Sequence, residues 1–228
     1  ALVPVVNRAE QQGIAVVDFD NLTASDMVTS VVVDQITFGE ILGEWLVEQM
    51  GGSGDIAVFN GIEGTSISAD RFQGLKNVLE DYPDVNIVQT VYAAWAYNQA
   101  RTAMEDIYAA HPNLDGIWSQ GGAMSQAALD FYMERGIEPP PIPGEGLNGF
   151  MKTWQEVREE YPDWTSIATS MPTYVSARAL DVAVRRLEGE DVPSEVELEL
   201  PVITQDNFQE YLYPDLPAPA GPAHRDPH

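Results

Sequence analysis

A glycine pattern in the second half of the chain is the first place where these residues could hold a cofactor. Residues 144–149 read Gly-Glu-Gly-Leu-Asn-Gly and match the G-x-G-x-x-G pattern of dinucleotide-binding loops. Such a loop follows directly on a strand, whereas residues 139–143 read Pro-Pro-Pro-Ile-Pro. Because proline cannot donate a hydrogen bond to a central strand, we expect no nucleotide and no cofactor here.

A second glycine-containing loop, residues 61–66, lies between a predicted strand and a predicted helix. It lacks the lysine of a phosphate-binding P-loop, so the sequence does not predict nucleotide hydrolysis. Loops at the carboxyl ends of parallel strands are nevertheless where open α/β sheets bind ligands. Arg71 follows about one and a half helical turns after Ser66 and could direct its donors toward such a ligand. The sequence supports equally well the alternative that Arg71 is exposed and pairs with nearby carboxylates on the surface.

Two further predicted strand ends carry residues that suit a sugar. Trp95 follows one strand, and an indole can stack on the apolar face of a sugar ring. The alternative is an aromatic side chain packed under its own helix. Gln120 and Gly121 follow another strand, where glycine permits either the close approach of a ligand or a simple turn.

The composition excludes several classes of chemistry. The chain has no cysteine and three histidines, so thiolate catalysis, disulfides, histidine-based metal sites and a Ser-His-Asp triad are not expected. Carboxylates are so frequent that pairs such as Asp18 and Asp20 carry no specific signal for acid–base catalysis. The net charge of −25 would repel nucleic acids and anionic membranes, and it would also suit adaptation to high salt. We expect a protein that catalyses nothing.

The elements that would position these residues alternate between strand and helix. Apolar runs predict strands at 14–19, 27–33, 55–60, 85–92, 114–119 and 166–169. Helical spacing of apolar residues predicts helices at 3–12, 36–50, 66–82, 98–110, 124–135, 150–160 and 174–188. This alternation is typical of βαβ units, and it predicts an α/β fold with doubly wound parallel sheets.

Four segments, in this order and with these separations, resemble the ribose-binding-protein-like family of periplasmic solute-binding proteins. They are residues 9–20, 61–74 with Gly64-Thr65-Ser66 and Arg71, 111–117, and 146–149. The resemblance extends over about residues 1–208. It implies the type I periplasmic-binding-protein fold, in which two α/β lobes are joined by a hinge and close on the ligand.

The resemblance also implies how the chain is divided. Residues 1–33 and 171–199 would be the remainder of the N-terminal lobe, and 34–170 with 200–213 would be the C-terminal lobe. Residues 214–228 are rich in proline and alanine and are predicted to be a disordered tail. The family's opening βαβαβ portion is not found, so we expect the first lobe to be incomplete. An incomplete sheet would leave an exposed edge through which two chains could form a dimer.

Carried over by resemblance, the site comprises residues from both predicted lobes. Asp20 would accept sugar hydroxyls, Arg71 would be the cleft arginine, and Trp95 the stacking aromatic residue. Asn148 stands where the family has Asp or Asn, and Ser170 where a polar side chain near the hinge is usual. Asn21 replaces a common arginine and Gly121 a common asparagine, so the resemblance does not support ribose itself as the ligand.

The implied function is capture of a small sugar or polyol and its delivery to the membrane permease of an ABC transporter. This function predicts a periplasmic or extracellular location, with an export signal that is not part of these residues. Two alternatives share the fold, namely the effector-binding core of a LacI-type transcription regulator and a sugar-sensing receptor module. The net charge of −25 disfavours the regulator.

Overall fold

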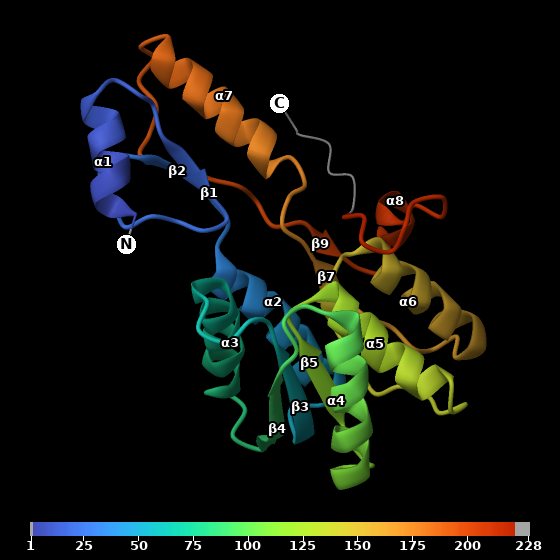
Figure 1. The fold of residues 1–228 in the computed structure, drawn as a ribbon. Coiled ribbons are helices and arrows are strands. Elements are labelled where there is room, and N and C mark those ends of the chain that lie inside the picture. The colour runs from blue at the N-terminus through green and yellow to red at the C-terminus, as the bar shows by residue number, and fades with distance from the viewer. Residues whose placement is uncertain (1, 222–228) are drawn as a thin grey trace. The chain divides into compact units, whose positions relative to one another are not determined.

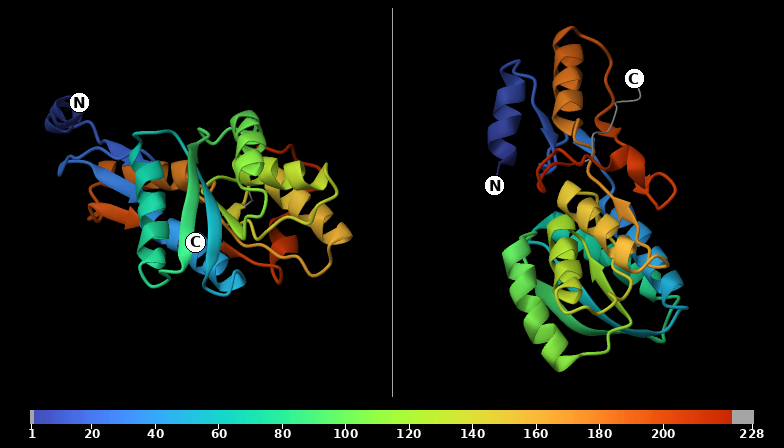
Figure 2. Two further views of the ribbon diagram at one scale, coloured as in Figure 1. Left: turned by 90° about the horizontal axis from the view of Figure 1, so that it is seen from below. Right: turned by 90° about the vertical axis from the view of Figure 1, so that its right-hand side faces the viewer.

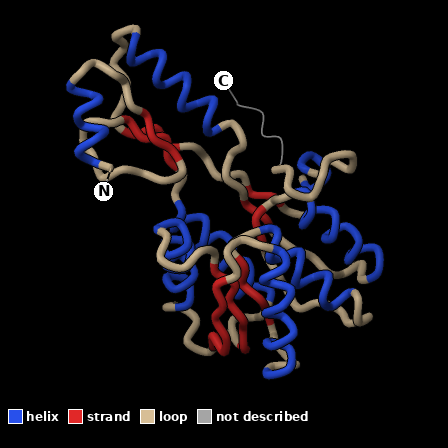
Figure 3. Tube along the Cα trace, viewed as in Figure 1, coloured by secondary structure: helices blue, strands red, loops and turns tan. Residues whose placement is uncertain are grey.

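The computed structural model describes residues 2–221, which form two compact units. Unit 1 contains residues 2–34 and 171–200, and unit 2 contains residues 35–170 and 201–221. Each unit has its own strands and helices, so the predicted α/β class is confirmed (Figures 1 and 3).

Unit 1 is built on a small parallel sheet. Its strands are β1 (Val17–Phe19), β2 (Thr29–Val32) and β8 (Glu195–Glu197), in the order β1-β2-β8. Its helices are α1 (Val3–Gln11) and α7 (Val175–Leu187). Ala179 and Val182 of α7 share a core with Val31, because these two positions lie one helical turn apart on the same face.

Unit 2 contains the remaining elements. Its helices are α2 (Gln35–Gln49), α3 (Ser66–Leu79), α4 (Tyr97–Ala110), α5 (Gly122–Met133), α6 (Asn148–Glu160) and α8 (Phe208–Tyr211). Its strands are β3 (Gly54–Asn60), β4 (Val85–Tyr92), β5 (Gly116–Ser119), β6 (Gly144–Glu145), β7 (Ala168–Thr169) and β9 (Val202–Ile203). The strand orders are β4-β3-β5, all parallel, and β6-β7-β9, in which β9 runs antiparallel to β7.

The central strand of unit 2 is buried on both faces. Residues 56–59 of β3 are 0% exposed, as a continuous apolar run in a parallel sheet predicts. Helices α2 and α3 lie on one face of the sheet, and α4, α5 and α6 lie on the other (Figures 1 and 2). The doubly wound arrangement brings the carboxyl ends of the parallel strands to one edge, where their following loops can form a site.

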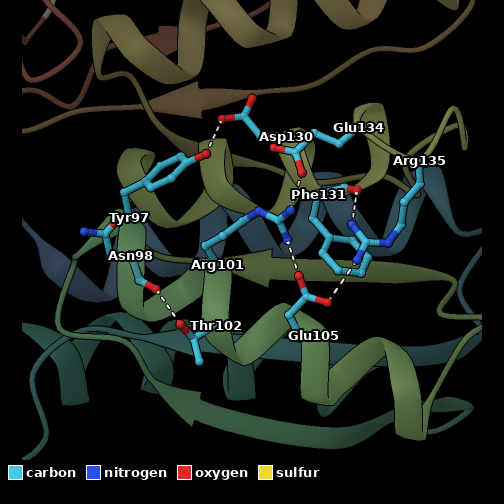
Figure 4. A network of polar contacts seen from close by, with 9 residues as sticks. All are labelled: Tyr97, Asn98, Arg101, Thr102, Glu105, Asp130, Phe131, Glu134 and Arg135. Atoms are coloured by element: carbon cyan, nitrogen blue, oxygen red, sulfur yellow. Dashed lines mark hydrogen bonds and ion pairs between the residues drawn. The ribbon is translucent and has the colours of Figure 1, made fainter.

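A polar network fastens α4 to α5 on the surface of unit 2 (Figure 4). The guanidinium groups of Arg101 and Arg135 lie 4.9 and 3.6 Å from the centre of the Phe131 ring, and Glu105 pairs with both arginines. Tyr97 Oη donates to Asp130 Oδ2 at 2.7 Å. Burial raises the pKa of the Tyr97 hydroxyl to about 12, and the bond to Asp130 raises it as well.

Burial also raises the pKa of Asp130, although the hydrogen bonds from Tyr97 and Thr153 lower it. Because Thr153 belongs to α6, this carboxylate links three helices. The network therefore holds α4, α5 and α6 together. Its arginines pair with glutamates of the same network.

Two features of unit 2 differ from the sequence-based expectations. A short strand, β6, follows directly on the proline-rich residues 139–143 and pairs in parallel with β7. Residues 214–221 of the predicted disordered tail lie against α6, where Ala218 O accepts a hydrogen bond from Gly149 N at 2.9 Å. The rest of that predicted tail, residues 222–228, lies outside the described residues.

Candidate functional site

Most of the predicted site residues of unit 2 follow the carboxyl ends of its strands. Trp95 lies in the loop after β4, Gln120 and Gly121 follow β5, Asn148 follows β6, and Ser170 follows β7. Because these strands are parallel, the topology places the ends of β3, β4 and β5 at one edge of their sheet.

Trp95 is held by an unusual backbone. Ala94 and Trp95 have φ angles of +51° and +53°, a region that residues other than glycine seldom adopt. Hydrogen bonds from Ala93 N to Asn60 O (2.9 Å) and from Ala94 N to Gly61 O (3.1 Å) fasten this loop to the end of β3. Such strain persists only where the surroundings impose it, and it fixes the direction of the indole.

Two glycines make room for the indole of Trp95. A β-carbon at residue 61 would clash with Cε2 and Cζ2 of the indole, and a β-carbon at residue 121 would stand 2.6 Å from its Cδ1. Trp95 thus lies against the residues that follow β3 and β5. It also packs against the core of unit 2 and is partly buried, so the predicted alternative of a packed aromatic side chain applies at least in part.

Gln120 is buried at the centre of this strand edge. Its Nε2 donates to Asn60 Oδ1 at 2.8 Å and lies within 3.4 Å of the Ser68 hydroxyl. Its backbone carbonyl accepts a hydrogen bond from Arg71 Nη1 at 2.7 Å. Gln120 therefore joins β3, β5 and α3.

Arg71 is 3% exposed and is held on several sides. Its Nε donates to Gln35 Oε1 at 2.8 Å, and its guanidinium lies 3.6 Å from the centre of the Phe38 ring. Its Nη2 lies 3.6 Å from Glu145 Oε1, at the end of β6. The structure thus places Arg71 at the strand edge, where its guanidinium has internal partners, and it is not the exposed surface arginine that was the alternative.

Asn148 and Ser170 lie at the ends of the other sheet, and both side chains are occupied. The amide of Asn148 is 1% exposed and bonds to the chain near Tyr213 and Leu216, at 2.9 and 2.7 Å. Ser170 Oγ accepts a hydrogen bond from Gly146 N at 2.9 Å. In this conformation both residues hold the backbone of the strand ends in place.

Asp20 and Asn21 belong to unit 1, directly after β1. Both are exposed, and Asn21 Nδ2 donates to Asp20 Oδ2 at 2.8 Å. Asp20 has a φ angle of +62°, which marks a sharp turn at the end of the strand. These two residues are therefore available for polar contacts from unit 1.

Three buried polar atoms beside Trp95 lack a hydrogen-bond partner within the described residues. They are Asn60 Nδ2, Trp95 Nε1 and Gln120 Oε1. An unpaired buried polar atom costs free energy, and an outside donor or acceptor would relieve that cost. Asn60 was not among the residues predicted from the sequence, although its polar side chain at the end of the apolar run 56–59 was the available signal.

Other parts of the described chain are weaker candidates for a ligand-binding site. A cavity of about 500 Å³ near the amino end of β3 is lined by the carboxylates Glu44, Glu48 and Asp81 and by Tyr82, and none of the buried unpaired polar atoms of the described residues belongs to its lining. Among residues 2–221, no group of three metal-binding side chains comes together. In the G-x-G-x-x-G segment, the backbone nitrogens of Asn148 and Gly149 bond to carbonyl groups of residues 220 and 218. The position that a phosphate would take is therefore filled.

The sequence matches the family model described as "Periplasmic binding protein domain" over residues 1–191. The chain belongs to this family. This periplasmic binding protein is 28% identical over 209 residues to the xylitol-binding protein of Mycolicibacterium smegmatis, covering 91% of this chain and 59% of that protein. It is 22% identical over 199 residues to a ribose import binding protein of Salmonella typhimurium, covering 87% of this chain and 66% of the relative.

The chain thus spans about 59 to 66% of the length of these curated relatives. Among solved structures, a periplasmic solute-binding protein of an ABC transporter from Actinobacillus succinogenes, with bound D-allose, superposes with a TM-score of 0.79. That protein is 24% identical, and the match covers 92% of this chain and 76% of that chain. The likeness confirms the predicted type I periplasmic-binding-protein fold. No helix within residues 2–221 is long and apolar enough to cross a membrane.

Proposed function

We propose that this periplasmic binding protein captures a small sugar or polyol and catalyses nothing. The observation that carries the proposal is the group of unpartnered polar atoms on Asn60, Trp95 and Gln120, beside the indole of Trp95. A sugar offers hydroxyl groups that both donate and accept hydrogen bonds, and its C–H face packs on an aromatic ring. Its hydroxyls would therefore pair with atoms that are otherwise buried at a cost.

Asp20 and Asn21 of unit 1 are proposed to contribute further hydroxyl contacts, since both side chains are exposed after β1. We also propose that units 1 and 2 correspond to the N-terminal and C-terminal lobes. Arg71 would act mainly by fixing the strand ends, because Gln120, Gln35 and Glu145 already engage its donors. Asn148 and Ser170 would do the same in the conformation described.

The names of the relatives support transport as the setting. We propose that the protein works outside the cytoplasm and delivers its ligand to the membrane permease of an ABC transporter. The regulator core and the receptor module remain alternative predictions for the same binding chemistry.

A thermal-shift screen tests the proposal. The chain is mixed with pentoses, hexoses, polyols, their deoxy forms and NAD, because a ligand that binds only the folded state raises the melting temperature. We expect a shift with at least one sugar or polyol and none with NAD. A shift with NAD alone, or with no member of the sugar panel, would contradict sugar capture.

Substitutions at two tryptophans, Trp95 and Trp164, test the role of the indole and supply a control. Trp95→Ala should abolish the shift, and Trp95→Phe should weaken it, because phenylalanine keeps a ring but lacks the indole N–H. Trp164→Phe removes an indole N–H that bonds to Pro140 O at 3.3 Å, away from the site. This control should keep the full ligand-induced shift, and equal losses in both phenylalanine variants would argue against a role of Trp95 in binding.

A further inference from the structure

A segment from the C-terminal part of the chain covers the start of α6. Residues 213–220, which we call the strap, pass over the first turn of this helix (Figure 1). Asn148 Nδ2 donates to the carbonyl oxygens of Tyr213 and Leu216 at 2.9 and 2.7 Å. Asn148 Oδ1 accepts a hydrogen bond from Tyr213 N at 3.1 Å. The buried side-chain amide of Asn148 therefore holds the strap with both its nitrogen, which donates, and its oxygen, which accepts.

The backbone of α6 makes a second set of contacts with the strap. Asn148 N donates to Ala220 O at 2.8 Å, and Gly149 N donates to Ala218 O at 2.9 Å. The first nitrogens of any helix lack partners within the helix, and no side chain caps α6. The carbonyl groups of the strap therefore act as the cap. Residue 149 must be small, since a β-carbon there would stand 2.8 Å from that of Ala218.

The composition of the strap suits a contact that opens and closes. Prolines at 214, 217 and 219 have no N–H to satisfy and restrict the free segment, so less conformational entropy is lost on docking. Leu216 is nevertheless 41% exposed, so little apolar surface holds the strap down. Hydrogen bonds are then the main contribution that opposes the entropy cost of ordering these eight residues.

We propose that the strap is a reversible cover that competes with the sugar for Asn148. This inference rests on the proposed function, because it takes the carboxyl end of β6 as part of the sugar site. With the strap docked, both hydrogens of the Asn148 amide are engaged. Release of the strap frees that amide and the two backbone nitrogens, all of which can donate to sugar hydroxyls.

The test loosens the strap in the full-length chain. The double variant Pro217→Gly/Pro219→Gly adds freedom to the undocked segment and changes no group on α6. Pro193→Gly makes the same kind of change at an exposed position of unit 1 and serves as the control. Hydrogen exchange of the Asn148 and Gly149 amides reports docking without any ligand. Calorimetry with the sugar found in the thermal-shift screen reports the affinity.

We expect exchange at both amides to be at least about threefold faster in the double variant, and the sugar to bind about three- to tenfold more tightly, with the control unchanged. Faster exchange with unchanged or weaker sugar binding would overturn the competition while leaving sugar capture intact. An unchanged exchange rate at both backbone amides would overturn the proposal that the strap docks reversibly. If neither chain binds any sugar of the panel, the proposed function fails, and this inference fails with it.

Discussion

Trp95 lies so close to Gly121 that a β-carbon at residue 121 would stand 2.6 Å from Cδ1 of the indole. The contact joins the loop after β4 to the residue that follows β5. It explains why glycine stands at a strand end where a polar side chain could otherwise meet a ligand. The absence of a side chain at Gly121 therefore decides where the indole of Trp95 lies in the candidate site.

The substitution Gly121→Ala should displace the indole and weaken sugar binding about tenfold, which corresponds to about 1.4 kcal/mol. The cause is overpacking, which also lowers the free energy of unfolding by about 1–3 kcal/mol. Titration calorimetry and tryptophan fluorescence would measure both effects. Gly43→Ala is the matched control, because its β-carbon would meet Leu75 at an easier 3.3 Å in the contact between α2 and α3. Full affinity in Gly121→Ala would show that the ligand does not depend on the position of Trp95.

The pair formed by Arg186 and Glu10 should carry stability in unit 1. Arg186 Nη1 and Nη2 donate to the two oxygens of Glu10 at 3.0 and 2.8 Å, and Nη1 also reaches Val16 O at 2.7 Å. The two side chains are only 20% and 11% exposed. Arg186→Gln should lower the free energy of unfolding by about 1.5–3 kcal/mol, as loss of hydrogen bonds to a charged group does.

The neighbouring residue offers a matched control for that substitution. Arg185 pairs with Glu190 through side chains that are 38% and 48% exposed. Arg185→Gln should therefore cost at most about 1 kcal/mol, the usual range for surface pairs. Urea unfolding of both variants gives the comparison, and equal losses would contradict the importance assigned to the pair between α1 and α7.

Alkaline pH should destabilise the protein partly through Tyr132. Burial raises the pKa of this hydroxyl to about 12, and the nearby Tyr108 raises it as well. Between pH 10 and 12 the unfolded chain loses this proton while the folded chain keeps it, so the free energy of unfolding falls as pH rises. The fall from this residue is at most about 1.4 kcal/mol per pH unit.

Tyr132→Phe removes that contribution and leaves the ring that packs against Phe131 at 5.6 Å. As pH rises from 10 to 12, the free energy of unfolding should therefore fall more for the wild type than for Tyr132→Phe. Below pH 10 the difference between their free energies of unfolding should be constant. Chemical denaturation at a series of pH values measures it, and parallel curves across the whole range would refute the assignment.

An apolar stripe on α7 should make unit 1 self-associate. Leu180, Val184 and Leu187 lie on one face of this helix and are 66%, 44% and 69% exposed. Apolar surface of this kind favours contact with a second copy, as does the open edge of the small sheet. Light scattering should show dimers at high protein concentration.

Leu180→Gln/Leu187→Gln should shift the self-association equilibrium toward the monomer. Ile62→Gln, at a 48% exposed apolar residue of unit 2, should leave it unchanged and serves as the control. A wild-type chain that stays monomeric at all concentrations would rule out the predicted dimer. Salt should strengthen the association, because it screens repulsion between chains of net charge −25.

The longer elements could be predicted because local patterns determine them. The run that forms β3 is apolar and bounded by glycine, and the strand at Val85–Tyr92 was predicted at its observed bounds. Three of the shortest elements, β6, β9 and α8, could not be predicted. Strands β6 and β9 have two residues each and exist only because β7 lies between them to pair with both. Helix α8 has four residues, too few to show a helical period.

The resemblance of four segments indicated the family, and the sequence by itself determined the order of the longer strands and helices and the strand ends after which Trp95 and Gln120 stand. These features follow from hydrophobic period and residue order along the chain, which are local. Only the tertiary structure decided which polar groups are free, because hydrogen-bond partners come from distant residues. It paired Asn148 with a segment 65 residues away and left Nδ2 of Asn60, a residue that had not been predicted from the sequence, without a partner within the described residues. Pairing of this kind depends on the packing of whole elements, and that packing decided the composition of the candidate site.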